Sequence, residues 1–288
     1  MTPAAARAPD TVTLYHVPNS TAGFTEAQIS NLFGIVDWQP EAHSAMPDVV
    51  AHGRRPTVMP CGYCHLADGA GRPENAMLAG LPATYIEAQI RDMRSGTRKA
   101  AFAGPYRPTE VMRRIADSAT DAEISQAAQY YSQLTPRLRT KIVETTTIPK
   151  PVPQIGLYYP AAARGTEPLG RRLITMPSDT LRHELRDPGL LYVTYVPPGS
   201  LARGKALATS WRDDGAAPCT SCHGDALHGV GPIPPTAGRF PAYILRQLLA
   251  FKTGARSTAA SQPMNDVASK LSLDDMIAVA AYEGSLHP

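Results

Sequence analysis

Two short motifs of identical pattern contain all four cysteines of the chain. Each reads C-x-x-C-H, and together they comprise Cys61, Cys64 and His65, and Cys219, Cys222 and His223. Two thiols three positions apart on one helical turn point the same way, so each can form a thioether with one vinyl group of a haem. The following histidine is then carried beneath the ring, where an imidazole nitrogen can bind the iron. The spacing predicts two covalently bound haem c groups.

Other chemistries of paired cysteines fit this pattern less well. One zinc shared by both motifs would need to join Cys64 to Cys219, far beyond the spacing of a zinc ribbon or finger. A thioredoxin-like redox pair would follow a strand, and neither motif does. Structural disulfides would not require a histidine after the second cysteine in both places. Haem attachment is therefore the favoured interpretation.

The chain also contains an internal repeat. When Cys61 is aligned with Cys219, residues 78–90 fall on 236–248 and residues 95–98 on 253–256. The first copy then has a short insertion around residues 102–107, after which Met112 aligns with Met264 and Tyr130 with Tyr282. The sequence therefore contains one domain twice.

The elements that position these residues are predicted to be helical, so the expected fold is all-α. Apolar spacing predicts helices over 82–93 and 241–249, stopped near Gly96 and Gly254. Thr120 opens a capping box before a second helix that runs toward Gln133, and Ser272 opens its counterpart, which runs to about Glu283. Residues 25–36 form a further candidate helix.

The second axial position of each iron needs another side chain. Met112 and Met264 occupy equivalent positions, predicted to lie in a loop after the first helix of each copy. Thioether sulfur is a soft ligand that favours ferrous iron and raises the reduction potential relative to two histidines. We expect both methionines to be ligands. His52 is the alternative that would give the first iron two histidines.

The order of motifs resembles that of the class I cytochromes c, in their tandem dihaem subgroup. It comprises C-x-x-C-H, an Ala-Gly turn, Tyr-x-x-x-Gln in a helix, Gly-x-Arg, a methionine, and Ala-x-Tyr in the last helix. By this resemblance Arg98 and Arg256 would bind haem propionates, and Tyr85 and Tyr243 could reach them too.

The chain departs from the subgroup's pattern in two places of the first copy. The family places a proline whose carbonyl accepts the proximal imidazole N–H. Pro234 fits this in the second copy, but the first has Ala76, so we expect another carbonyl to orient His65. The usual N-terminal helix fits residues 199–210 in the second copy, whereas the first has only the short stretch 47–52.

We expect four segments: an N-terminal extension over 1–45, a first cytochrome c domain over 46–140, a proline-rich linker over 141–198 and a second cytochrome c domain over 199–288. Nine prolines fall in the linker, with one strand-like run at residues 190–196. The length of this segment predicts that it lies across the surface and contributes a docking site.

The predicted function is electron transfer rather than enzymatic catalysis, because an iron with both axial positions filled by protein exchanges electrons with little rearrangement. The partners would be redox proteins: a membrane complex or dehydrogenase as donor and an oxidase or another cytochrome as acceptor. One alternative is a dihaem cytochrome c peroxidase-like enzyme with one open haem and Glu110 as acid or base. Another is the cytochrome subunit of a periplasmic dehydrogenase complex.

Composition and charge exclude some other classes. The net charge of +3 is too small for nucleic acid to be the main partner, and no apolar run is long enough to span a bilayer as a helix. Haem is attached to this motif outside the bacterial cytoplasm, so we expect a periplasmic protein. Residues 1–6 lack the features of a secretory signal, which we interpret as a leader already removed.

Overall fold

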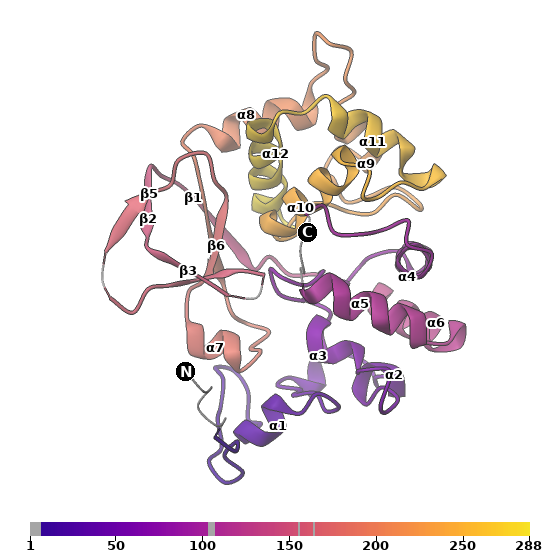
Figure 1. Ribbon diagram of the computed structural model, residues 1–288, viewed down its shortest axis with the longest axis vertical. Helices are drawn as coiled ribbons and strands as arrows, with labels where there is room; N and C mark the ends of the chain where they lie inside the picture. Colours follow the sequence, from indigo (N-terminus) through magenta and orange to yellow (C-terminus); the bar gives the residue numbers. More distant parts are fainter. Residues whose placement is uncertain (1–6, 103–106, 155, 164) are drawn as a thin grey trace, which may run out of the picture.

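The computed structural model describes residues 7–102, 107–154, 156–163 and 165–288, so residues 1–6 and most of the short insertion lie outside the described residues. Figure 1 shows two helical domains, one above the other, with a β-rich segment beside both. The first domain consists of α2 (Asp48–Ala51), α3 (Cys61–His65), α4 (Ala83–Arg94), α5 (Arg107–Ser118) and α6 (Asp121–Ser132). The second consists of α8 (Ser200–Thr209), α9 (Thr220–His223), α10 (Pro241–Lys252), α11 (Gln262–Ser269) and α12 (Leu273–Ser285).

The predicted capping boxes begin the last helix of each domain. The Thr120 hydroxyl accepts from the amide of Glu123 at 3.2 Å, and the Glu123 carboxylate accepts from the amide of Thr120 at 2.7 Å. Ser272 and Asp275 make the same pair of bonds at 3.1 and 2.9 Å. Each box satisfies amide groups that the first helical turn would otherwise leave without a partner.

The two domains close in different ways. In the second, α8 crosses α12 so tightly that a Cβ on Gly204 would lie 2.0 Å from the carbonyl oxygen of Ala278. In the first, the four-residue α2 replaces that helix, and its Val49 and Val50 join the buried core together with Ile124 of α6. The short stretch at 47–52 therefore does supply the closing contact of the first domain.

The proline-rich segment is folded, so the expectation of an all-α chain is too narrow. A three-stranded sheet has the order β1 (Thr140–Glu144), β7 (Tyr192–Val196), β6 (Ile174–Pro177), with β1 parallel and β6 antiparallel to β7. Strand β2 (Thr147–Pro149) pairs with β5 (Thr166–Pro168), and β3 (Pro151–Pro153) with β4 (Tyr158–Pro160). Strand β7 confirms the predicted run at 190–196. We call residues 140–196 the β module.

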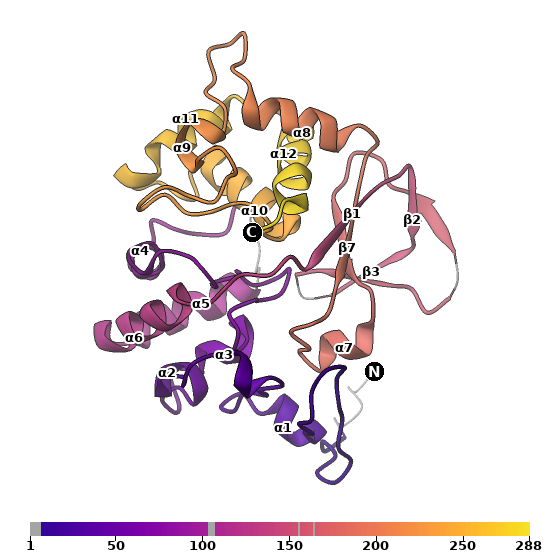
Figure 2. The same ribbon diagram turned by 180° about the vertical axis from the view of Figure 1, so that it is seen from behind.

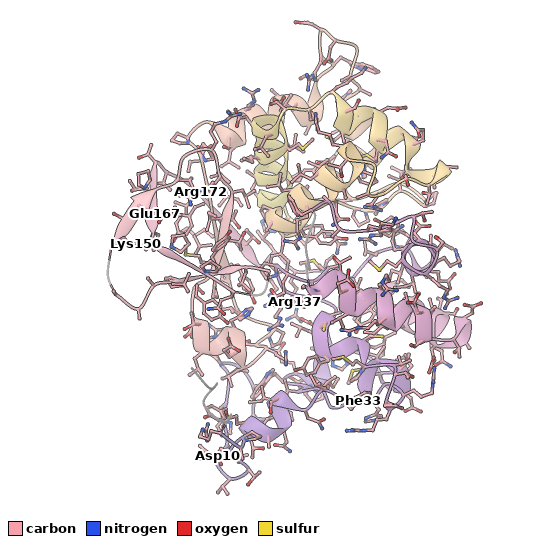
Figure 3. The ribbon with its side chains drawn as sticks, in the orientation of Figure 1. Asp10, Phe33, Arg137, Lys150, Glu167 and Arg172 are labelled. Carbon is pink, nitrogen blue, oxygen red and sulfur yellow. The ribbon has the colours of Figure 1, made fainter. Side chains whose placement is uncertain are left out.

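The β module has a small core of its own, which explains why its prolines do not leave it a loose tether. Ile148, Leu169, Ile174 and Met176 pack together and are almost completely buried. Figure 3 shows Lys150, Glu167 and Arg172 at the outer edge of the module, where Arg172 donates to Glu167 at 2.8 Å. The short paired strands place their prolines at strand ends and edges, where a missing N–H costs no ladder bond.

The N-terminal extension joins the module to the first domain. Its helix α1 (Glu26–Ser30) is shorter than predicted, because the Asn31 side chain accepts from the amide of Phe33 at 3.0 Å and ends the helix. Trp38 donates its indole N–H to the carbonyl of Leu185, just after α7 (Thr180–Glu184), at 2.8 Å. Figure 2 shows α7 and α1 as neighbours from the opposite side. Within the described ranges, no helix has the length and apolar character to cross a membrane.

Candidate haem sites

Each proximal histidine is oriented by a backbone carbonyl. His65 Nδ1 lies 2.8 Å from the carbonyl oxygen of Ala76, and His223 Nδ1 lies 2.8 Å from that of Pro234. A carbonyl can only accept, so Nδ1 carries the proton and Nε2 keeps its lone pair for a metal. The prediction that a different carbonyl would replace that of the missing proline was wrong. Ala76 supplies the same acceptor, because the backbone path is the same.

Glycines keep the two proximal loops on that path. Gly71 has a φ of +60°, and its amide donates to the carbonyl of His65 at 3.0 Å; Gly229 has a φ of +81° and donates to His223 at 2.9 Å. A Cβ at Gly71 would lie 2.4 Å from the carbonyl oxygen of Ala76, and one at Gly229 would lie 2.6 Å from that of Ile233. Only glycine allows both the conformation and the close approach.

The protonation states suit haem attachment. Burial lowers the pKa of His65 and of His223, so both imidazoles are neutral at neutral pH, as metal ligation requires. Burial also raises the pKa of the Cys61 thiol to about 12. None of the four cysteines forms a disulfide. Neutral imidazoles with a free Nε2 beside two unpaired thiols are the donor set that a covalently held haem needs, so the residues fit the group.

A large apolar cavity brings the predicted residues of the first site together. It is lined by Cys61, Cys64 and His65 on one side and by Met112 on α5, with Ile86, Met93, Ile115 and Tyr131 among its apolar walls. Arg98 lines it as well. The prediction that Met112 and Met264 lie in loops was wrong, since Met112 lies inside helix α5 and Met264 inside helix α11. Met264 lies in helix α11 and packs against the apolar cluster that Cys219 also contacts.

The alternative residues lie elsewhere. His52 is exposed and is not among the residues that line the cavity. Glu110, the acid or base of the peroxidase-like alternative, is exposed in the first turn of α5, and its neighbours Thr109 and Met112 line the cavity instead. In the described part of the chain, no group of three or more His, Cys, Asp or Glu residues is arranged to hold a metal ion.

The two arginines expected at propionates meet at the contact between the domains. Arg98 donates to Gln89 of its own domain at 2.9 Å and to Tyr243 and Gln247 of the other domain at 3.1 Å each. Arg256 donates to Gln247 at 3.1 Å and across the contact to Gln89 at 2.7 Å. A backbone hydrogen bond also links the two domains here, from the amide of Lys99 to the carbonyl of Ala255 at 2.7 Å. The pairs are related by the internal repeat.

Sequence reasoning missed several side chains that build the first site from outside its own domain. Arg246 donates to the carbonyl of Pro73 at 2.6 Å, and buried Arg239 donates to those of Met77 and Ala79 at 2.9 and 3.0 Å. From the β module, the guanidinium of Arg186 stacks 3.9 Å from the ring centre of Tyr63, inside the C-x-x-C-H motif. Nothing in the local sequence marks these residues, because each contact depends on the packing of distant segments.

The first copy's Cys64 is partly buried, whereas Cys222 is exposed. Two segments cover the first motif: the β module through Arg186, and the N-terminal extension through Ile35, whose Cδ1 would lie 3.1 Å from a Cβ on Gly62. The two attachment motifs therefore have the same sequence pattern but differ in solvent exposure.

Comparisons with known proteins agree with this geometry, although no family profile matches the chain. Cytochrome c4 of Azotobacter vinelandii is 25% identical over 250 residues, which is 85% of this chain and 92% of the relative. The thiosulfate dehydrogenase electron acceptor of Thiomonas intermedia is 29% identical over 230 residues, 79% of this chain and 78% of the relative. Cytochrome c-554(548) of Halomonas halodenitrificans is 37% identical over 73 residues, 25% of this chain and 81% of the relative.

Two solved structures have a similar fold. Thiosulfate dehydrogenase TsdBA from Marichromatium purpuratum matches 83% of this chain and 39% of its own, with a TM-score of 0.54 and 26% identity. Reduced cytochrome c4 from Pseudomonas stutzeri matches 79% of this chain and 93% of its own, with a TM-score of 0.52; at 23% identity it shows the fold alone. The chain belongs to the class I cytochromes c, in their tandem dihaem group, and carries two covalently bound haem c groups.

Proposed function

We propose that this dihaem electron-transfer cytochrome holds each iron between a histidine and a methionine: His65 with Met112, and His223 with Met264. The observation that carries the proposal is the first cavity, which Met112 lines together with His65 and both cysteines of its motif. The internal repeat extends the assignment to Met264, which packs in the cluster that Cys219 contacts. The bound haem supplies one-electron chemistry, and no side chain of the protein needs to act as acid, base or nucleophile.

The protein's own residues set the conditions for that chemistry. The carbonyls of Ala76 and Pro234 hold the imidazoles in one tautomer and orientation, so the Nε2 atoms need no rearrangement when charge arrives. Methionine sulfur favours the reduced iron and raises the potential. We further propose that Arg98 and Arg256 reach propionates from their places at the domain contact, since a guanidinium has donors to share between Gln89, Gln247 and a carboxylate.

The domain limits 46–140 and 199–288, and the periplasmic location, belong to the same proposal. The partners are redox proteins, and we favour a dehydrogenase as the electron donor. Support comes from the relatives named thiosulfate dehydrogenase electron acceptor and from the similar segment within TsdBA. The acceptor would be an oxidase or a further cytochrome.

Axial ligation is tested by the near-infrared absorption of the oxidised protein, which contains a weak band from sulfur-to-iron charge transfer. Met112→Ala and Met264→Ala should each remove about half of this band, because each removes one of two equivalent sulfur ligands. His52→Ala should leave it unchanged. If the near-infrared band kept its full intensity in both methionine variants, the assignment of the two ligands would be refuted. A rapid steady-state turnover of peroxide by the wild type would instead support the enzyme alternative.

A further inference from the structure

One buried carboxyl group distinguishes the second haem site from the first. Glu283 on α12 and Tyr131 on α6 occupy equivalent positions of the repeat. The Glu283 carbonyl accepts from the amide of Gly238 at 2.8 Å, and the Tyr131 carbonyl accepts from the equivalent amide of Gly80 at 3.1 Å. Both side chains are buried, Glu283 to 4% exposure and Tyr131 completely. The repeat therefore places a carboxyl group in one domain where the other has a phenol.

A second substitution accompanies the first. Thr236 of the second domain corresponds to Leu78 of the first, and their amides donate to the equivalent carbonyls of Leu227 and Gly69 at 2.9 and 2.8 Å. The Thr236 hydroxyl lies beside the Glu283 carboxyl, and so does the sulfur of Cys219. In the second domain, these two positions thus place a carboxyl and a hydroxyl group beside the first cysteine of the haem motif.

Among the residues that the structure describes, none of the groups that shift the pKa of Glu283 is a cation. Cys219 packs against a buried apolar cluster of Ala208, Leu227 and Ala237, which Tyr282 and Leu286 also contact. Burial raises the pKa of Glu283 to about 7, against the smaller opposite effects of Thr236 and Cys219. Four charged or titratable groups of the neighbouring segments bind other partners: Arg203 binds Asp275, Arg239 binds carbonyls of the first domain, His223 binds Pro234 and His228 binds His287. Lys205 of α8 is exposed.

The attached haem would further change the surroundings of the Glu283 carboxyl. Cys219 loses its thiol proton when it becomes a thioether, so it can no longer donate to the carboxyl, and the ring excludes further water. The oxidised centre carries one more positive charge than the reduced one, and a neighbouring positive charge favours the ionised form of a carboxyl. Reduction therefore raises the proton affinity of Glu283, and by reciprocity protonation of Glu283 makes reduction easier.

We propose that Glu283 is a redox-linked proton-binding site, which takes up one proton from water as the second haem iron gains one electron and releases that proton on oxidation. The donor protein supplies the electron, the O–H bond of the carboxylic acid forms at Glu283, and the total charge of the second site stays constant. The first site, with Tyr131 and Leu78, exchanges electrons without this proton. The proposal rests on the electron-transfer function of the chain.

The test is a set of redox titrations of the full-length holoprotein from about pH 4 to about pH 9, a range that brackets the ordinary and the raised carboxyl pKa of Glu283. We expect the potential of the second haem to fall as the pH rises. Its slope should approach a tenfold change in the equilibrium constant for reduction per pH unit, about 59 mV for one electron. In Glu283→Gln the slope should vanish, whereas the matched variant Tyr131→Phe should retain it. Met264→His, which lowers the potential of the second haem, assigns the two waves.

A second measurement keeps the test sharp if Glu283→Gln folds poorly. The infrared difference spectrum of the wild type should gain the C=O band of a carboxylic acid on reduction and lose it on oxidation. A wild type in which the second haem shows neither the pH slope nor this band overturns the proposal while leaving electron transfer intact. An unchanged slope in Glu283→Gln assigns the proton to another group and also overturns the proposal. A protein that cannot be reversibly reduced would refute the electron-transfer function itself.

Discussion

Single residues decide how each haem motif is held, and the proximal loop glycines are the clearest case. We expect Gly229→Ala to destabilise the protein by about 1–3 kcal/mol, because the new Cβ would meet the Ile233 carbonyl at 2.6 Å in a left-handed conformation. Gly231→Ala is the matched control: its φ of +57° is equally unusual, but nothing lies within 4 Å. Denaturant unfolding should show a larger loss for Gly229→Ala. Equal losses would mean that the close approach is irrelevant.

His183 predicts how stability depends on pH. It is buried, accepts from or donates to the Tyr192 hydroxyl at 2.8 Å, and burial lowers its pKa from 6.5 to about 3. The unfolded chain therefore binds a proton that the folded protein excludes. Stability is complete above about pH 6.5 and falls as the pH drops toward 3, by at most about 1.4 kcal/mol per unit.

Urea titrations at several pH values measure this effect. His183→Gln should flatten the acid side of the stability curve relative to the wild type, although its stability at neutral pH will be lower. His16→Gln, at an exposed position, should keep the wild-type dependence. A curve for His183→Gln that remains parallel to the wild type would rule out His183 as the source.

Among the residues, the sequence alone identified the two C-x-x-C-H motifs, and the repeat paired Met112 with Met264 as the proposed axial ligands. It did not predict that the Ala76 carbonyl replaces that of a proline, because a hydrogen bond to a carbonyl depends on the backbone path and leaves no mark on residue type. The sequence shows a glutamate at position 283, but its burial cannot be predicted from the sequence because it depends on how the folded chain packs.

At the scale of elements, helix packing separates the second domain from the first. Gly204→Ala should cost about 1–3 kcal/mol, since the added methyl group would force α8 away from α12, where Cβ would lie 2.0 Å from the Ala278 carbonyl. Thermal unfolding measures the loss. Lys205→Ala, on the exposed face of the same helix, should change stability by less than about 0.5 kcal/mol. If Gly204→Ala is equally mild, the two helices are not in tight contact.

Elements with strong local signals were predictable, and the others were not. The capping boxes at Thr120 and Ser272 fixed the starts of two helices correctly. Helices α5 and α11 were both missed, so Met112 and Met264 were placed in loops; α11 has only eight residues and no side-chain cap at its start. The three-residue strands of the β module carry too few residues for a periodic pattern, and their prolines imitate a linker.

The whole molecule is joined by buried arginines that cross between domains. Arg239 donates to two carbonyls of the first domain, and burial lowers its pKa to about 10, which leaves it charged at neutral pH. Arg239→Ala would leave both carbonyls buried without a partner, at a cost of about 2–4 kcal/mol. Calorimetry should show one cooperative transition for the wild type and two separate transitions for the variant.

The control for this experiment is Arg171→Ala, which removes an exposed ion pair with Asp274 and should leave a single transition near the wild-type temperature. A single transition in Arg239→Ala would show that other contacts suffice to couple the domains. This level of organisation could not be predicted from sequence: the repeat indicates two similar domains, but nothing local indicates that Arg98 and Arg256 exchange partners between them.

The stacking of Arg186 on Tyr63 affects how a redox partner would approach the first haem motif. Cys222 is exposed, whereas Cys64 is only partly exposed and its neighbour Tyr63 lies behind Arg186 of the β module. A redox protein that approaches from outside would therefore meet less covering chain at the second haem motif than at the first. The two copies of the domain thus differ in how directly a partner would reach the cysteine side of each haem.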